Sequence, residues 1–442
     1  MKTGQDPERA FFIVVLSWVA ICLLGAVPLY CCGHFPSFLD ALFESVSGFT
    51  TTGATVLSDV ESLPPWVNLW RCATHWFGGL GVIALAVALL PLLGAGGFRL
   101  IKAETSGPEK GKFTTRVTNT AKILWIIYFG MTVLQAALLH GVGFGPVDAI
   151  AHAFSTMGTG GFSTRNASVG AFANPAAEWI CTVFMLLASV NFTLYYRLVS
   201  GRFSDFRRDS ELRAFCAVVG VAVVGITAVR ATDFASLADT FRTVAFQVAS
   251  IISTTGFMTD DYLTWRPASQ VLLLSLFFIG GCSGSTAGGI KVIRWTVLSK
   301  QMRNELLRLV HPHGVFTLRI NGNAGREAIV PVVGSFVLVY FVLVFLTTVV
   351  GALGGLDAWT AFTAALSMVG NVGPAFGALG PTANCGFLPA GVKAWYCLAM
   401  LAGRLEIYTL VIFILACIRR VRIGRSGRCR TRISSEKISE HS

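Results

Sequence analysis

The chain has 442 residues, of which 54% are hydrophobic and only 13% are charged, and its net charge is +12. Soluble domains carry roughly 25% charged residues, so the composition excludes a soluble globular protein and indicates a polytopic membrane protein. Five charge-free stretches exceed the roughly 20 residues needed to cross the hydrocarbon core of a bilayer. They span residues 10–39, 72–98, 123–147, 267–290 and 328–356, and shorter candidates lie at 179–196, 214–229 and 407–418.

The first apolar run follows MKTGQDPERAFF and is not followed by a small-residue cleavage site. We therefore expect a first transmembrane helix rather than a signal peptide. The eleven cysteines are scattered, mostly singly within apolar runs, without a CxxC motif or a His/Cys metal spacing. We interpret them as small hydrophobic residues.

Basic residues gather in four clusters, at 99–122, 197–213, 291–326 and 419–437, which alternate with segments poor in Lys and Arg. The positive-inside rule predicts that these clusters and both termini face the cytoplasm. The basic tail is then expected to contact anionic lipid rather than nucleic acid. The opposite segments hold eleven of the 23 acidic residues and six basic ones. This imbalance favours attraction of cations to the outer mouth.

An internal repeat is the most informative feature of the chain. Four segments share one pattern: SGFTTTGATV (47–56), STMGTGGFST (155–164), SIISTTGFMT (250–259) and SMVGNVGPAF (367–376). Alignment on their glycines makes Gly53, Gly160, Gly256 and Gly373 equivalent. Each segment follows a short amphipathic run with an acid near its start, and apolar runs flank each unit. The pattern predicts a helix, a short half-crossing helix, an extended glycine loop and a second helix, four times.

Irregular backbone at membrane depth is tolerated only where it is buried in protein or lines a water-filled cavity. Four such loops in one chain can meet around a single axis. Rings of backbone carbonyls replace the water shell of a permeating cation, and a short helix that ends at the loop directs its negative end towards the ion. Four copies favour an ion pore over simple packing of small residues between helices.

With these motifs, the stretches HWFGGLGVIALAVALLPLLGAGG (75–97), AETSGP (103–108), GGCSGSTAGGIKVIR (280–294) and GRLEIYTLVIF (403–413) resemble the Trk/Ktr/HKT superfamily of potassium transporters, above all the bacterial Trk membrane subunits. The resemblance covers about residues 8–420. It implies an all-α polytopic membrane protein with four covalently linked helix–pore loop–helix repeats around a pseudo-fourfold ion pore. The expected parts are repeats at 8–105, 113–202, 208–312 (its second helix broken at 280–289) and 325–420, then a basic cytoplasmic tail at 421–442. Longer bacterial Trk subunits have an extra N-terminal pair of helices that is not expected here.

The resemblance also implies a function, which is potassium uptake through a gated, channel-like pore in the bacterial inner membrane. It implies a homodimer that works with a cytoplasmic RCK/KTN-type nucleotide-binding ring, and no organic cofactor on this subunit. In the family, glycine at each filter favours potassium, and serine in the first filter favours sodium. The implied K⁺-binding residues are Thr51, Thr52, Gly53, Gly158, Thr159, Gly160, Thr254, Thr255, Gly256, Asn371, Val372 and Gly373.

The glycine-rich stretch that interrupts the second helix of the third repeat corresponds to the family's intramembrane gate, and Arg404 to a pore arginine below the filter. Lys291 and Arg294 allow two interpretations, a gating role or simply the cytoplasmic end of a helix. Arg404 and Glu406 are two residues apart and point to different helix faces, so they are not a local pair. The expected gate residues are Gly281, Ser283, Gly284, Ser285, Gly288, Gly289, Lys291 and Arg404.

Three other functions compete for the same motifs. A phosphate-binding loop needs lysine directly after the second glycine, then Ser or Thr, but here Ile290 intervenes and Val292 follows, which excludes it. An intramembrane serine protease would use Ser283 with a base beside it, and His75 and His152 are expected on the other half of the membrane. A proton- or sodium-coupled potassium symporter remains the alternative within transport.

Overall fold

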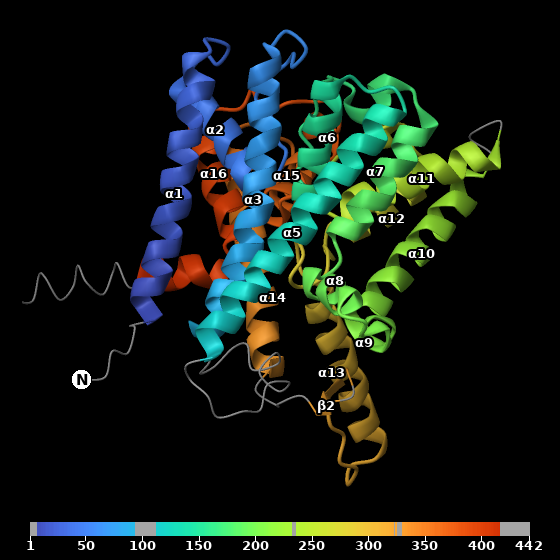
Figure 1. The fold of residues 1–442 in the computed structure, drawn as a ribbon. Coiled ribbons are helices and arrows are strands. Elements are labelled where there is room, and N and C mark those ends of the chain that lie inside the picture. The colour runs from blue at the N-terminus through green and yellow to red at the C-terminus, as the bar shows by residue number, and fades with distance from the viewer. Residues whose placement is uncertain (1–6, 93–111, 232–235, 322, 325–328, 416–442) are drawn as a thin grey trace, which may run out of the picture.

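A computed structural model describes residues 7–92, 112–231, 236–321, 323–324 and 329–415. The predicted motif at 103–108 and the basic tail at 421–442 lie outside these residues. The described chain is almost entirely helical (Figure 1). A two-residue strand, β1 (Arg319–Ile320), pairs antiparallel with β2 (Asn323–Ala324). The protein therefore has the expected all-α fold.

Within the described residues, four helical segments are long and apolar enough to cross a membrane. They are Phe12–Cys31, Ala121–Gly141, Ser210–Arg230 and Ile329–Leu353. Two further pairs of helices pass the same test but are bent, by 92° and 111°; they are Pro175–Ala188 with Phe192–Val199, and Ala390–Arg404 with Ile407–Leu415. These segments make the chain a multi-pass membrane protein.

The helices form four successive units, each with a short helix between longer ones. The first contains α1 (Pro7–Cys31), α2 (Phe38–Phe49) and α3 (Pro65–Leu92). The second contains α5 (Lys112–Gly141), α6 (Pro146–Gly158), α7 (Pro175–Ala188) and α8 (Phe192–Val199), followed by α9 (Phe203–Arg208). The third contains α10 (Ser210–Arg230), α11 (Leu237–Ile252), α12 (Pro267–Leu276) and α13 (Val292–Val310). The fourth contains α14 (Ile329–Leu353), α15 (Ala358–Gly370) and α16 (Ala390–Arg404).

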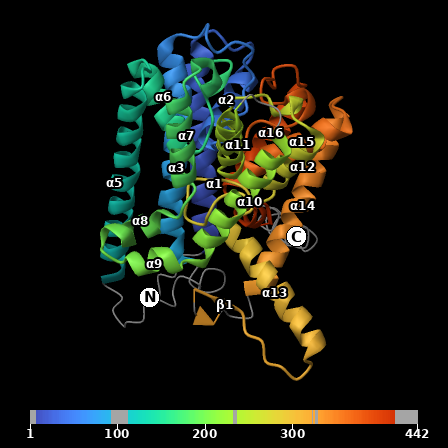
Figure 2. The same cartoon turned by 90° about the vertical axis from the view of Figure 1, so that its right-hand side faces the viewer.

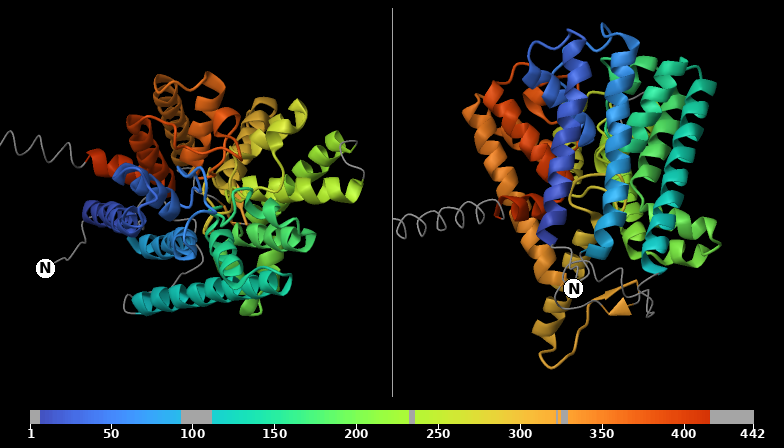
Figure 3. Two further views of the ribbon diagram at one scale, coloured as in Figure 1. Left: turned by 90° about the horizontal axis from the view of Figure 1, so that it is seen from above. Right: turned by 60° about the vertical axis from the view of Figure 1, so that its left-hand side comes forward.

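Helices α2, α6, α11 and α15 are the predicted half-crossing helices. They have 12 to 16 residues, and at about 1.5 Å per residue they are too short to cross the roughly 30 Å hydrocarbon core. Ser37, Ser236 and Asp357 cap the N-termini of α2, α11 and α15 with side-chain hydrogen bonds. Seen from above, the four units follow one another around a common centre, where the loops after the short helices meet (Figure 3).

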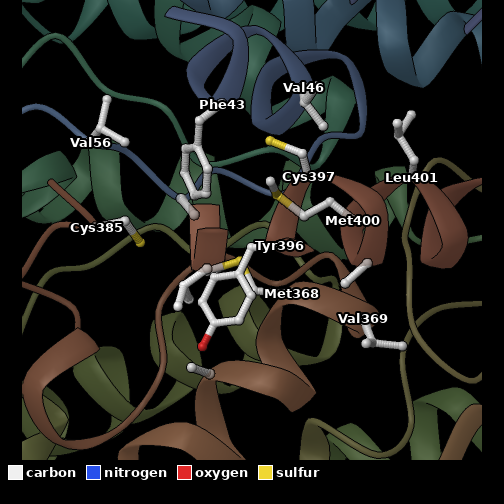
Figure 4. Close-up of a cluster of buried hydrophobic side chains, with 14 of the residues drawn as sticks. Phe43, Val46, Val56, Met368, Val369, Cys385, Tyr396, Cys397, Met400 and Leu401 are labelled. Carbon is white, nitrogen blue, oxygen red and sulfur yellow. The ribbon is translucent and has the colours of Figure 1, made fainter. Parts of the chain in front are cut away.

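The fourth unit packs against the first, which closes the ring of units. Phe43 of α2 belongs to the same buried cluster as Met368 of α15 and Met400 of α16 (Figure 4). Lys393 of α16 donates a 2.6 Å hydrogen bond from Nζ to Oδ1 of Asp40 on α2, and both residues are buried. The two ends of the described chain are thus joined by apolar packing and by an ion pair.

The second long helix of the third unit is broken. Helix α12 ends at Leu276 and α13 begins at Val292, so the glycine-rich segment 280–289 lies in the irregular part between them. Beyond the break, α13 extends away from the body of the molecule (Figure 2). The broken helix brings irregular backbone to the inner end of the central loops.

Candidate ion pore

The backbone makes the same left-handed turn once in each unit, directly after the short helix. Thr51, Thr159, Thr254 and Asn371 have φ angles of 54°, 56°, 56° and 55°. Left-handed φ costs a non-glycine residue about 1–3 kcal/mol, and such residues cluster at functional sites. Fourfold recurrence of this conformation identifies the start of four equivalent loops.

The turn is also the C-terminal cap of each short helix. The N–H of Thr52, Gly160, Thr255 and Val372 donates to the carbonyl of Ser47, Ser155, Ser250 and Ser367, at 2.8, 2.9, 2.9 and 2.9 Å. This bond, with a left-handed residue before the donor, is the Schellman arrangement that ends many helices. The negative end of each of the four helix dipoles therefore lies at the start of its loop.

A glycine with positive φ follows two residues after each left-handed residue. These glycines are Gly53, Gly161, Gly256 and Gly373, with φ of 82°, 85°, 79° and 99°. The sequence alignment that made Gly160 equivalent to Gly53 is therefore wrong by one residue. Two adjacent glycines, Gly160 and Gly161, allow alternative alignments, and the backbone conformation agrees with the spacing from Ser155, which selects Gly161.

These four glycines form a closed ring with the carbonyls of their neighbours. A Cβ added at Gly53 would collide with the carbonyl oxygen of Gly160 in the next loop, because the two backbones are in contact. The contacts continue in one direction around the centre: Gly161 meets the Thr255 carbonyl, Gly256 meets the Val372 carbonyl and Gly373 meets the Thr52 carbonyl. Four carbonyl groups of equivalent residues thus lie around one axis.

His75 of α3 supports the loop of the second unit from behind. Its Nε2 accepts a 3.1 Å hydrogen bond from the N–H of Phe162, so Nδ1 carries the proton and donates to the Gly48 carbonyl at 2.8 Å. A Cβ at Gly160 would run into this imidazole ring. His75 is therefore a structural brace between α2 and the second loop.

A buried ion pair supports the loop of the first unit. Arg71 of α3 is 1% exposed and lies 2.7 Å, Nη2 to Oε1, from Glu44 of α2, which is 0% exposed. Glu44 also accepts hydrogen bonds from Thr55 Oγ1 (2.9 Å) and from the N–H of Val56 (3.0 Å), both in the loop. The guanidinium also lies 4.3 Å above the ring of Phe162. Glu44 and Arg71 thus link the first loop to the second.

Of the acids predicted to form a cation-attracting mouth, Asp40, Glu44, Asp148, Glu178 and Asp239 lie in helices, and Asp59, Glu61 and Asp260 lie in loops. Much of their charge is paired, because ion pairs join Arg71, Arg165, Arg230, Arg242 and Lys393 to acids of these segments. At the loop tips, Asn166 donates to Asp59 at 2.8 Å, and this bond lowers the pKa of the Asp59 carboxyl below its ordinary value. The structure thus uses many of these acids to join the units.

The broken segment lies directly against the starts of the loops, beside the C-terminal ends of the short helices. The N–H of Gly288 donates a 2.7 Å hydrogen bond to Oγ1 of Thr254, and a Cβ at Gly288 would approach the Gly370 carbonyl. Arg404, 5% exposed, donates from Nη1 to the Thr286 carbonyl at 2.6 Å and from Nη2 to the Gly78 carbonyl at 3.2 Å. The segment is therefore held between the third loop, α16 and α3.

Lys291 and Arg294, at the end of the broken segment, are not simply hydrated helix-end charges. Lys291 is 8% exposed and donates from Nζ to the Ala287 carbonyl at 2.5 Å. Arg294 pairs with Glu406 and lies 3.6 Å above the ring of Phe336. Lys291 thus bonds within the broken segment, and Arg294 fastens the start of α13 to the fourth unit.

Several residues of this site were not expected from sequence. Gly161 was hidden by the neighbouring Gly160, although its spacing from Ser155 equals that of Gly53 from Ser47. In the sequence, Glu44, Arg71 and His75 stand out only as polar residues among apolar ones. Glu211 of α10, which accepts hydrogen bonds from the broken segment, carried no local signal that would link it to residues 280–294.

Comparison with known proteins agrees with this geometry. The family model TrkH, described as a cation transport protein, matches residues 2–418. The Trk system potassium uptake protein TrkH of Salmonella typhimurium is 42% identical over 419 residues, which cover 93% of this chain and 86% of that protein. The protein TrkI of Halomonas elongata, also named a Trk system potassium uptake protein, is 36% identical and covers 94% and 84%. The crystal structure of the potassium transporter TrkH from Vibrio parahaemolyticus superposes with a TM-score of 0.83 at 37% identity, covering 93% of this chain and 86% of that one.

Proposed function

The chain belongs to the TrkH family of cation transport proteins, and from this premise we propose that it carries potassium into the cell through a gated, channel-like pore. The observation that supports this most directly is the ring in which each of four loop glycines contacts the carbonyl of the next loop. The relatives are named potassium uptake proteins. The permeant ion of the proposal is therefore K⁺.

The proposed filter consists of the four loops after α2, α6, α11 and α15. Their backbone carbonyls replace the water shell of K⁺, while the negative ends of the four short helices stabilise the cation at the centre. Glycine at the ring keeps side chains away from the carbonyls. We assign K⁺ binding to Thr51, Thr52, Gly53, Thr159, Gly160, Gly161, Thr254, Thr255, Gly256, Asn371, Val372 and Gly373. The one-residue offset in the second loop replaces Gly158, the last residue of α6, by Gly161.

The proposed gate is the broken segment beneath the filter. In this conformation, Gly288 and Thr286 are held by Thr254 and Arg404, so the segment occupies the inner end of the pore and the state is closed. Opening requires these bonds to break while the four loops stay in place. The gate residues of the proposal are Gly281, Ser283, Gly284, Ser285, Gly288, Gly289, Lys291 and Arg404.

The proposed organisation follows the family resemblance. Pore repeats at 8–105, 113–202, 208–312 and 325–420 span a bacterial inner membrane, with both termini and the tail at 421–442 in the cytoplasm. Two copies form a homodimer that works with a cytoplasmic RCK/KTN-type nucleotide-binding ring. The chain itself holds no organic cofactor and is not an enzyme.

The bonding of Ser283 argues against the protease alternative. Its hydroxyl donates to Oε2 of Glu211 at 2.6 Å, whereas His75 and His152 bond to other partners near the loops. The protease alternative would use one of these histidines as the base that accepts the Ser283 proton, and neither is hydrogen-bonded to Ser283. Protease activity that disappears in Ser283→Ala would nevertheless overturn the transport proposal.

Reversal potentials in liposomes test the proposal and separate it from coupled transport. The purified chain is reconstituted with a potassium gradient, and the expected reversal potential follows the potassium Nernst potential. A clear shift with an imposed proton or sodium gradient would instead establish the symporter. Rescue of potassium uptake in a transport-deficient host, with and without a Trk-type regulatory partner, tests the same function in cells.

A further inference from the structure

A buried carboxylate outside the filter bonds to the broken segment at Ser283 and to the start of α13 at Ile293. Glu211, in the first turn of α10, is 5% exposed. Its Oε1 accepts hydrogen bonds from the N–H of Ser283 at 2.6 Å and from the N–H of Ile293 at 3.1 Å, while its Oε2 accepts from the Ser283 hydroxyl at 2.6 Å. Among the described residues it forms no ion pair within 4 Å. Its carboxylate oxygens therefore bond to the broken segment and to the start of α13, and not to a basic side chain.

The two bonded positions explain what the carboxylate does physically. The first N–H groups of a helix lack partners within the helix, and Lys291, at the N-cap of α13, makes no side-chain capping bond. Glu211 supplies the missing acceptor at Ile293 and places a negative charge at the positive end of the helix dipole. Through Ser283, the Glu211 side chain also holds the backbone directly before Gly284.

Between these two anchored positions lie the residues that touch the pore. Thr286 is held by Arg404 and Gly288 by Thr254, so the segment is fixed at the filter side and, through Glu211, at the α10 side. Gly284 and Gly289 have φ of 70° and 71°, and such glycines leave the intervening backbone free to change conformation. Loss of the α10 anchor would release the segment without altering the filter.

We propose that Glu211 is a positioning residue for the gate, whose carboxylate holds segment 283–293 in the closed position by bonding to Ser283 and Ile293. This inference rests on the proposed function. Glu211 lies in α10 rather than in the pore loops, so it acts on open probability and leaves ion selectivity unchanged. The hydrogen bonds, more than the charge itself, carry the effect.

The test compares Glu211→Ala with Glu211→Gln in liposomes that contain the full chain. Alanine removes all three bonds. Glutamine retains them, because its oxygen can accept from both backbone N–H groups while its amide donates to the Ser283 hydroxyl, which can rotate. We expect E211A to raise rubidium flux about tenfold, since it leaves all three donors without their acceptor, and E211Q to stay near the parent. Asp205→Ala on α9, which removes an acid paired with Arg197, is the control and leaves flux unchanged.

A second pair of variants changes the hydrogen bond between Ile293 and Glu211 at Ile293 instead of at Glu211. Proline is tolerated in the first turn of a helix and removes a backbone donor. Ile293→Pro therefore deletes the bond from Ile293 to Glu211, while Ile293→Ala shortens the side chain and keeps the bond. We expect I293P to raise flux above I293A. This pair decides the question even if E211A does not fold.

Three measurements are made on every variant: rubidium flux, the rubidium/sodium flux ratio and the melting temperature in detergent. The expected result is higher flux in E211A and I293P with an unchanged ratio. The inference is overturned if E211A conducts no faster than the parent, if E211Q behaves like E211A, or, where E211A does not fold, if I293P conducts like I293A. A parent chain that carries no rubidium would instead refute the proposed function itself.

Discussion

Arg404 of α16 donates a 2.6 Å hydrogen bond from Nη1 to the backbone carbonyl of Thr286 in the broken segment of the third unit. The same guanidinium reaches the Gly78 carbonyl of α3 in the first unit, at 3.2 Å from Nη2. One side chain therefore connects three of the four units just below the filter. No acid pairs with Arg404 among the described residues, so under the proposed function its charge would also repel a permeating cation.

Replacement of Arg404 by methionine should open the pore more often. Methionine retains much of the length and apolar volume but removes both hydrogen bonds and the positive charge. A hydrogen bond from a charged donor is worth about 1.5–3 kcal/mol, so loss of even one of the two predicts a rise in rubidium flux of at least about tenfold. Arg308→Met, whose partner Glu305 lies on an exposed face of α13, is the matched control. Equal flux in the two variants would exclude Arg404 from the gate.

Gly53→Ser should weaken the preference for potassium over sodium. A serine side chain at φ 82° is strained, and its Cβ would push against the Gly160 carbonyl. Strain of about 1–3 kcal/mol corresponds to roughly a tenfold loss of selectivity. The rubidium/sodium flux ratio measures this effect, and an unchanged ratio would contradict the filter assignment.

Gly161→Ser should lower the same ratio to a similar extent, because Gly161 meets the Thr255 carbonyl as Gly53 meets the Gly160 carbonyl. Its neighbour Gly160 provides the comparison. An added Cβ there meets the imidazole of His75 instead, so Gly160→Ala should disturb the brace and lower the melting temperature. If Gly160→Ala lowered the rubidium/sodium flux ratio more than Gly161→Ser does, Gly160 and not Gly161 would be the equivalent of Gly53.

Arg71→Met should destabilise the protein, since it leaves the carboxylate of Glu44 buried without its cation. Breaking a buried pair on one side costs about 3–5 kcal/mol. The double variant Glu44→Gln with Arg71→Met removes both charges and should recover much of that loss. Thermal unfolding in detergent measures both variants. A double variant less stable than R71M would show that the pair is not the source of the effect.

Deletion of Gly284–Gly288 should raise potassium flux in a chain that still folds. The deletion removes Thr286 and Gly288, the residues held by Arg404 and Thr254, and shortens the broken segment beneath the proposed filter. Flux per folded protein is the readout, with folding checked by size-exclusion chromatography. A folded deletion variant that conducts no faster would refute the gate.

Much of the fold was predictable because its signals are local. Apolar length predicts spans, an acid near the start of a short amphipathic run predicts a half-crossing helix, and five glycines in 280–289 predict a break. The long-range contacts had no such signal. Lys393 and Asp40 are 353 positions apart and Arg404 and Thr286 are 118 apart, and no local periodicity relates residues at such separations.

By itself, the sequence determined the four-unit plan, the all-helical class and the position of the loops, since these follow from hydropathy and from backbone freedom at glycine. Tertiary structure alone decided which carbonyl each loop glycine meets, and which charges act as braces. The reason is geometric. Folding of two different units brings Gly161 against the Thr255 carbonyl across the axis, and no pattern within either loop specifies that contact.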